Sequence, residues 1–223
     1  MNRIILVSLA LVFTACGGTG TALDHNRAGS GSGMLLVTAQ VDASNDLNSP
    51  TTSLQVDLAD GIGNPVSSAI VTVHNGDFGD VTLVEATAGT GHYTNSRAAV
   101  SNNDFGLDVS HPTKGTVTGV VVGNPGMQSI KAPVASATVP AAAALAISWT
   151  TPTTSQSASV ETRDLTQTLV PDTGTYTIAA ASNPANTRQV LKVRRYNTVN
   201  LAGGIIGSSM SVTSKASVSY VVQ

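Results

Sequence analysis

The chain has 223 residues, a formal net charge of −2 and only 11% charged residues. A nucleic-acid-binding domain is expected to have an excess of Lys and Arg, which this sequence does not have, so we expect no nucleic-acid partner. Aromatic residues make up 4% of the sequence, and Val, Thr, Ser, Ala and Gly are its main components. Because β-branched side chains pack well on strands and lose rotamer freedom on helices, the composition predicts an all-β protein.

The first fifteen residues have the layout of a secretory signal. Arg3 supplies a positive charge, and the uncharged stretch IILVSLALVFT follows it. This apolar stretch is too short to span a membrane as a helix, which takes about 20 apolar residues. We therefore expect residues 1–15 to be a signal peptide that is removed from the mature protein.

Cys16 is the only cysteine of the chain, so it cannot form an internal disulfide. The sequence Phe13-Thr14-Ala15-Cys16 resembles the lipobox of bacterial lipoproteins, with Phe13 where Leu is usual. The resemblance implies cleavage before Cys16, a diacylglycerol on its thiol, acylation of the new amino terminus and an envelope location. Gly17, in place of an aspartate, favours the outer membrane. The alternative is an ordinary cleaved signal that leaves a free thiol.

Residues 16–33 are predicted to be the lipidated terminus and a flexible tether. The stretch GGTGTALDHNRAGSGSG is rich in glycine and has few apolar side chains, which is the composition of a flexible linker. Such a tether would hold the folded part of the chain away from the membrane.

Alternating apolar residues predict a first β-sandwich over residues 34–133. Leu54, Val56 and Leu58 fall on one face of a strand, with polar residues between them. Asn75-Gly76 follows an apolar run and predicts a hairpin turn. About six or seven short strands separated by turn residues are typical of a β-sandwich.

A second β-sandwich is predicted for residues 134–223. Its alanine-rich beginning is too short to nucleate a stable helix, so we interpret it as a linker into a strand. That strand places Leu145, Ile147 and Trp149 inward, and Trp149 is predicted to anchor the core. The final alternation, residues 210–222, predicts a long strand.

Two stretches resemble known sandwich families. "GNPVSSAIVTV", followed by "GTGHYT" and "FGLDVS", is similar to the prealbumin-like and Ig-like repeats of bacterial surface proteins. "LAISWTTP" resembles the second strand of a fibronectin type III domain. These resemblances imply two tandem β-sandwich domains of Ig-like or fibronectin-like architecture, without fixing the strand order.

Polar clusters offer two candidate sites, each with a simpler explanation. His74, Asp77 and Asp80 flank the Asn-Gly turn, with His92 and His111 elsewhere in the domain. Because Asn and Asp are common in turns and no known metal-loop spacing is matched, we predict no metal site and no cofactor besides the lipid.

The second candidate is a group of cations near residue 190. Arg188, Lys192 and Arg194 share strand parity and are a candidate anion-binding stripe for phosphate or an acidic sugar. The solvated outer face of a strand explains the same pattern.

The sequence therefore predicts a membrane-anchored bacterial envelope lipoprotein that acts in binding, adhesion or assembly, with an envelope protein or polysaccharide as partner. The motifs Gly-x-Ser-x-Gly, Ser-x-x-Lys and His-Glu-x-x-His are absent, and no enzyme activity is predicted. One alternative is an accessory domain or hydrolase acting on envelope polysaccharide or peptide. Another is a structural subunit recruited through an unpaired strand at residues 210–222.

Overall fold

Alternating burial builds the strands of this protein. In the computed structural model, which describes residues 25–45 and 49–223, strand β3 (Thr51–Ala59) buries Leu54, Val56 and Leu58 and turns the residues between them outward. The same period of two recurs along most strands. Among the described residues, helical geometry occurs at His25 and in the short 3-10 helix η2 (Ala180–Ser182).

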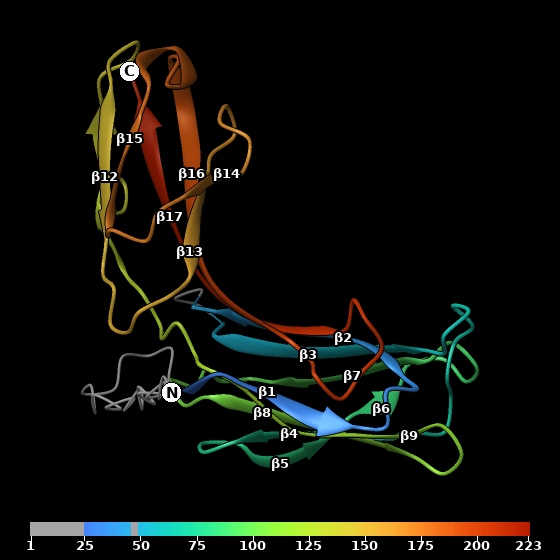
Figure 1. The fold of residues 1–223 in the computed structure, drawn as a ribbon. Helices are drawn as coiled ribbons and strands as arrows, with labels where there is room; N and C mark the ends of the chain where they lie inside the picture. Colours follow the sequence, from blue (N-terminus) through green and yellow to red (C-terminus); the bar gives the residue numbers. More distant parts are fainter. Residues whose placement is uncertain (1–24, 46–48) are drawn as a thin grey trace, which may run out of the picture.

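Two sheets face each other in the first sandwich, as Figure 1 shows. One has five strands in the order β1 (Arg27–Gly31), β9 (Gly115–Val122), β8 (Phe105–His111), β4 (Ile70–Asn75) and β5 (Gly79–Thr82). The facing sheet contains β17 (Ser209–Val222), β2 (Leu36–Ser44), β3, β7 (His92–Arg97) and β6 (Val84–Glu85). Aliphatic side chains from both sheets, with Phe105 and Tyr93, fill the space between them.

The second sandwich is built on the continuation of that facing sheet. Its larger layer runs β14 (Thr168–Val170), β13 (Ser157–Glu161), β16 (Asn186–Asn200) and β17, with β11 (Thr138–Val139) beside the end of β17. Its smaller layer is β10 (Ile130–Ala132), β12 (Leu145–Trp149) and β15 (Thr175–Ile178). Trp149 is buried in the core between the layers, so its predicted role as a core anchor is confirmed.

The protein is therefore all-β, with two tandem sandwiches, as the composition and strand pattern predict. The Asn75-Gly76 hairpin is present, but it closes through a longer turn, because Asn75 pairs with Gly79. The stretch expected to feed a strand does lead into β12, where Ile147 faces the core.

Strands β16 and β17 belong to both sandwiches, which corrects the predicted division at residue 134. They are 15 and 14 residues long, and they pair with each other along almost their whole length. Leu191 and Val193 pack in the second core, whereas Leu201, Met210 and Val212 pack in the first. A strand of 14 residues is about 46 Å long, which is longer than the strands of a single sandwich usually are. Alternation of apolar and polar residues does not reveal that such a strand continues from one sandwich into the other.

Strand β17 is also not an unpaired edge. It pairs antiparallel with β16 on one side and parallel with β2 on the other, from Ser209–Thr38 to Lys215–Ser44. This arrangement contradicts the idea that residues 210–222 await a strand from another protein.

A buried ion pair lies where the two sandwiches meet. Arg195 is 0% exposed, and its Nε and Nη2 donate to Asp172 Oδ2 at 2.8 and 2.7 Å. The guanidinium also donates to the carbonyl oxygens of Pro125 and Thr153. Trp149 Nε1 donates to the second oxygen of Asp172 at 3.1 Å. Burial alone raises the pKa of Asp172, but hydrogen bonds from Arg195 and other donors outweigh it and hold the pKa below its ordinary value.

The connection between the sandwiches is fixed to the same hairpin. Gln128 is buried and its Nε2 donates to the carbonyl oxygens of Val193 and Ser214, each at 2.9 Å. Asn197 Nδ2 donates to the Gly123 carbonyl at 2.7 Å. The segment between β9 and β10 is thus bound to the shared strands and does not behave as a free linker.

Strand β1 corrects the predicted tether. Residues 16–24 lie outside the described residues, but Arg27–Gly31 pairs with β9 in a regular antiparallel register. A Cβ at Gly31 would lie 2.1 Å from the Thr116 carbonyl oxygen and 2.6 Å from that of Gly203. The glycines of this stretch therefore permit close backbone packing, a use that composition does not distinguish from flexibility.

We predict that Gly31→Val destabilises the protein by about 1–3 kcal/mol, because the added side chain forces β1 away from its neighbours. Ser30→Ala, at the exposed neighbouring position, should leave the free energy of unfolding unchanged. Urea unfolding of both variants measures the difference. Equal stabilities would mean that residues 27–31 are a tether after all.

Candidate functional site

The three predicted cations do not form one stripe. Lys192 Nζ and Arg194 Nη1 both bind Glu161 of β13, at 2.8 and 2.6 Å. These hydrogen bonds hold the pKa of Glu161 below its ordinary value. Arg188 lies near the start of β16, about 20 Å from Arg194 along the strand. It lines a separate pocket with Tyr220.

Arg194 instead meets a lysine that the sequence did not place with it. Arg194 of β16 pairs in register with Lys215 of β17, which in turn pairs with Ser44 of β2. Alternation places Lys215 on the outward face of β17, whereas the long-range pairing of β17 with β2 has no local sequence signal. These strands frame a pocket of about 270 Å³, lined by Asp42, Ala43, Ser44, Arg194, Thr213 and Lys215. We call it the Lys215 pocket.

The Lys215 pocket is polar and is lined by two cations, Arg194 and Lys215, and one carboxylate, that of Asp42. The ammonium of Lys215 has no hydrogen-bond or ion-pair partner among residues 25–45 and 49–223. Arg194 uses Nη1 for Glu161, and within the same described part its other guanidinium nitrogens have no partner. Hydroxyl groups of Ser44 and Thr213 and the carboxylate of Asp42 complete the lining. The arrangement can hold an anionic group and hydrogen-bond to hydroxyls beside it.

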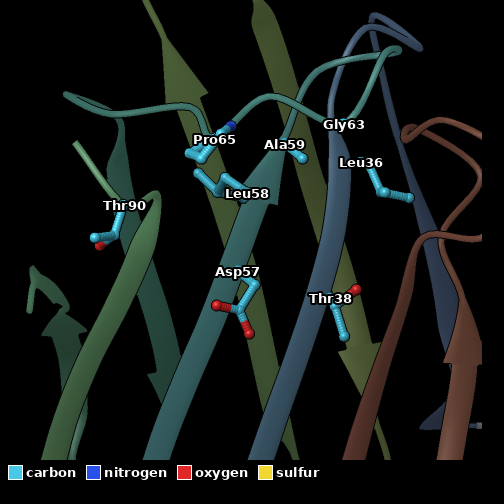
Figure 2. A pocket seen from close by; sticks show the side chains of 8 residues that line it. All are labelled: Leu36, Thr38, Asp57, Leu58, Ala59, Gly63, Pro65 and Thr90. Carbon is cyan, nitrogen blue, oxygen red and sulfur yellow. The ribbon is translucent and has the colours of Figure 1, made fainter.

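A second pocket lies on the first sandwich and is shown in Figure 2. Its volume is about 200 Å³, and it is lined by Leu36, Thr38, Asp57, Leu58, Ala59, Gly63, Pro65 and Thr90. Asp57 Oδ1 accepts a hydrogen bond from His92 Nδ1 at 2.6 Å. Most of the lining atoms belong to aliphatic or small residues, and His92 is not among them.

The other predicted polar cluster is divided between separate interactions. His74 contacts Asp80 at 2.7 Å and Asp108 at 3.1 Å. Burial lowers the pKa of His74, but the hydrogen bonds and charges of the two aspartates raise it above its ordinary value. Asp77 instead accepts a hydrogen bond from Ser101 Oγ at 2.6 Å, and His111 Nδ1 caps the turn that follows its own strand. In the part of the chain that the structure describes, no three His, Cys, Asp or Glu side chains are arranged so that they could hold a metal ion together.

Sequence reasoning also missed the buried ion pair of Arg195. Arg195 lies on the same side of β16 as Leu191 and Val193, which face the second core. A cation at a core-facing position was the feature of the sequence that could have identified the buried pair.

The predicted lipidation site, Cys16, lies outside the described residues. Within those residues, no helix has the length and apolarity needed to cross a bilayer.

Comparison with known proteins finds only distant structural similarities. No family model and no curated protein matches the chain. Fibronectin(III)-like modules of Clostridium thermocellum CbhA are 14% identical, with a TM-score of 0.30, over 85% of this chain and 94% of theirs. The Yersinia pseudotuberculosis adhesin InvE is 14% identical, with a TM-score of 0.26, over 82% of this chain and 60% of its own. A chimeric titin Z1Z2-Z1Z2 tandem is 14% identical, with a TM-score of 0.23, over 87% of this chain and 99% of its own. None of these similarities assigns a ligand or a role to this protein.

Proposed function

We propose that this protein is a lipid-anchored binding module of the bacterial cell envelope, with an anionic polysaccharide as its ligand. The sequence Phe13-Thr14-Ala15-Cys16 supports the anchor, with acyl chains on Cys16 and an outer-membrane location. The observation that carries the binding role is the Lys215 ammonium, which has no hydrogen-bond or ion-pair partner in the described part of the chain and lies beside Arg194 in the Lys215 pocket. The proposed role is binding without catalysis.

The chemistry of the Lys215 pocket favours an acidic sugar unit. A carboxylate or phosphate on the sugar would accept charge-assisted hydrogen bonds from Lys215 and Arg194. Neighbouring sugar hydroxyls would donate to Asp42 and exchange hydrogen bonds with Ser44 and Thr213. The volume of about 270 Å³ is small for a ligand site, which suits one unit of a longer chain whose remainder stays in solvent.

The rigid joint between the sandwiches supports a binding role in a second way. Asp42 and Ser44 come from β2 of the first sandwich, while Arg194 comes from the part of β16 that pairs with β13 of the second. Because the shared hairpin fixes these strands in register, the pocket is organised before any ligand arrives. Preorganisation of this kind reduces the entropic cost of binding.

We predict that Lys215→Met lowers the affinity for a uronic-acid oligosaccharide by at least about tenfold, since one charge-assisted hydrogen bond is lost. Arg194→Met should have a similar effect. Lys131→Met, which removes an exposed cation from β10, is the matched control and should bind like wild type. Titration calorimetry at two salt concentrations, beside an uncharged oligosaccharide, measures the effect. Wild-type binding by Lys215→Met, or equal binding of the uncharged sugar, would contradict the proposal.

For the anchor, we predict that wild type incorporates labelled palmitate and sediments with membranes, whereas Cys16→Ala does neither. Without its thiol the chain has no atom to accept the diacylglycerol, and two or more acyl chains are needed for stable attachment. Thr19→Ala, close to the same site, should behave like wild type. A membrane-bound, unlabelled wild type would show that another feature holds the protein.

A further inference from the structure

Two isoleucines protrude from the end of the first sandwich that is farthest from the second. Ile206 is 99% exposed, in the turn between β16 and β17, and Ile62 is 85% exposed, in the loop between β3 and β4. Both connections lie at the ends of their strands remote from the joint (Figure 1). Single exposed aliphatic side chains are common on protein surfaces, whereas several that lie together mark a contact surface.

The two loops lie side by side. A Cβ at Gly61 would be 3.7 Å from Ile205 Cδ1, so the residues that precede Ile62 and Ile206 are adjacent. The Ile205 amide donates to the Leu35 carbonyl at 2.7 Å, which brings half-exposed Met34 to the same place. We call the group Met34, Ile62, Ile205 and Ile206 the aliphatic tip.

Hydrogen bonds hold the isoleucines outward. Asp60 Oδ1 accepts from the amides of Ile62 and Asn64, at 3.1 and 3.0 Å, which shapes the first loop. In the second loop the Ser208 amide donates to the Ile205 carbonyl at 2.9 Å, and the Leu201 amide donates to the Ser208 carbonyl at 3.0 Å. These bonds give both loops a defined conformation in which Ile62 and Ile206 do not fold back onto the protein.

The shape of the aliphatic tip fits a bilayer better than a protein. A stable protein interface buries about 800 Å² on each partner, and four aliphatic side chains present far less. Acyl chains, in contrast, rearrange around a small protrusion and gain from each buried methylene. A single myristoyl chain binds membranes only marginally, and a contact of four aliphatic side chains is of comparable size, so a second attachment is required.

The length of the amino-terminal segment allows that second attachment. Cys16 precedes His25 by nine residues, which reach about 30 Å when fully extended. From Arg27, β1 and the residues up to Gly33 cover roughly 20 Å toward the aliphatic tip. Acyl chains on Cys16 can therefore enter the same membrane surface as the tip.

We propose that the aliphatic tip inserts into the membrane that holds the lipid anchor, giving the protein two points of attachment. The inference rests on the anchor proposed above. Lys215 follows Ile206 by nine residues of turn and strand, so the Lys215 pocket is held up to about 30 Å above the bilayer. The second sandwich, at the other end of the hairpin, then faces away from the membrane.

The test uses full-length lipidated protein in vesicles of phosphatidylcholine and phosphatidylglycerol. Ile206→Cys and Ile62→Cys each carry an environment-sensitive fluorophore, which acylation of Cys16 confines to the new thiol. Leu169→Cys is the matched control, because Leu169 is an aliphatic residue of the second sandwich with 70% exposure. Brominated lipids then measure contact between each label and the acyl chains.

We expect bromolipid quenching at positions 206 and 62 to exceed that at position 169 by at least about threefold, since bromine quenches only at short range. Equal quenching at all three positions, in protein that still floats with the vesicles, would overturn the inserted tip and leave the anchor intact. Protein that fails to float, with label on Cys16, would overturn both. Concentration-dependent label burial without lipid would assign the tip to a second copy of the chain and also overturn membrane insertion.

Discussion

The architecture depends on the buried ion pair between Arg195 and Asp172, placed where a hairpin passes from one sandwich into the other. Removing two charges from water is costly, and a buried pair is tolerated only when further hydrogen bonds satisfy its remaining atoms. Here carbonyl oxygens of Pro125 and Thr153 and the indole of Trp149 supply them. Because these partners come from the connecting segment, the second core and the shared strand, the pair holds only when all three are correctly placed. The pair thus couples the position of one sandwich to that of the other.

Because of that coupling, the shared hairpin holds the proposed binding features in fixed positions. The hairpin has the Lys215 pocket on its outer face, near the joint, and the aliphatic tip at its end. A flexible linker between two independent domains would place neither feature at a fixed distance from the membrane. Continuous strands fix the distance between the pocket and the tip. Under the proposed attachment of the tip and the anchor to a membrane, they also fix the direction in which the pocket faces.

Period-two alternation in the sequence was sufficient to predict the fold class, the inward side of β3 and the burial of Trp149, because each depends on neighbours within one strand. Strand β1 was not predictable, because its glycines look like those of a flexible tether. In the structure, Gly31 instead allows the backbone to pack closely against Thr116. The division between sandwiches was missed because alternation does not record which core a strand faces. At the candidate site, Arg194 was predicted as a ligand-binding cation, whereas Lys215 was not among the predicted site residues. Their meeting requires the register of β16 and β17, and Ser44 requires a parallel pairing across some 170 residues, which no local pattern reveals.

The most direct test of this account is the cooperativity of unfolding, measured by scanning calorimetry on the chain carrying Cys16→Ala. If the buried pair and the shared hairpin join the sandwiches into one folding unit, a single transition should appear, with equal calorimetric and van't Hoff enthalpies. Two separable transitions, with the fluorescence of Trp149 following only one of them, would show that the sandwiches fold independently and would contradict the central claim.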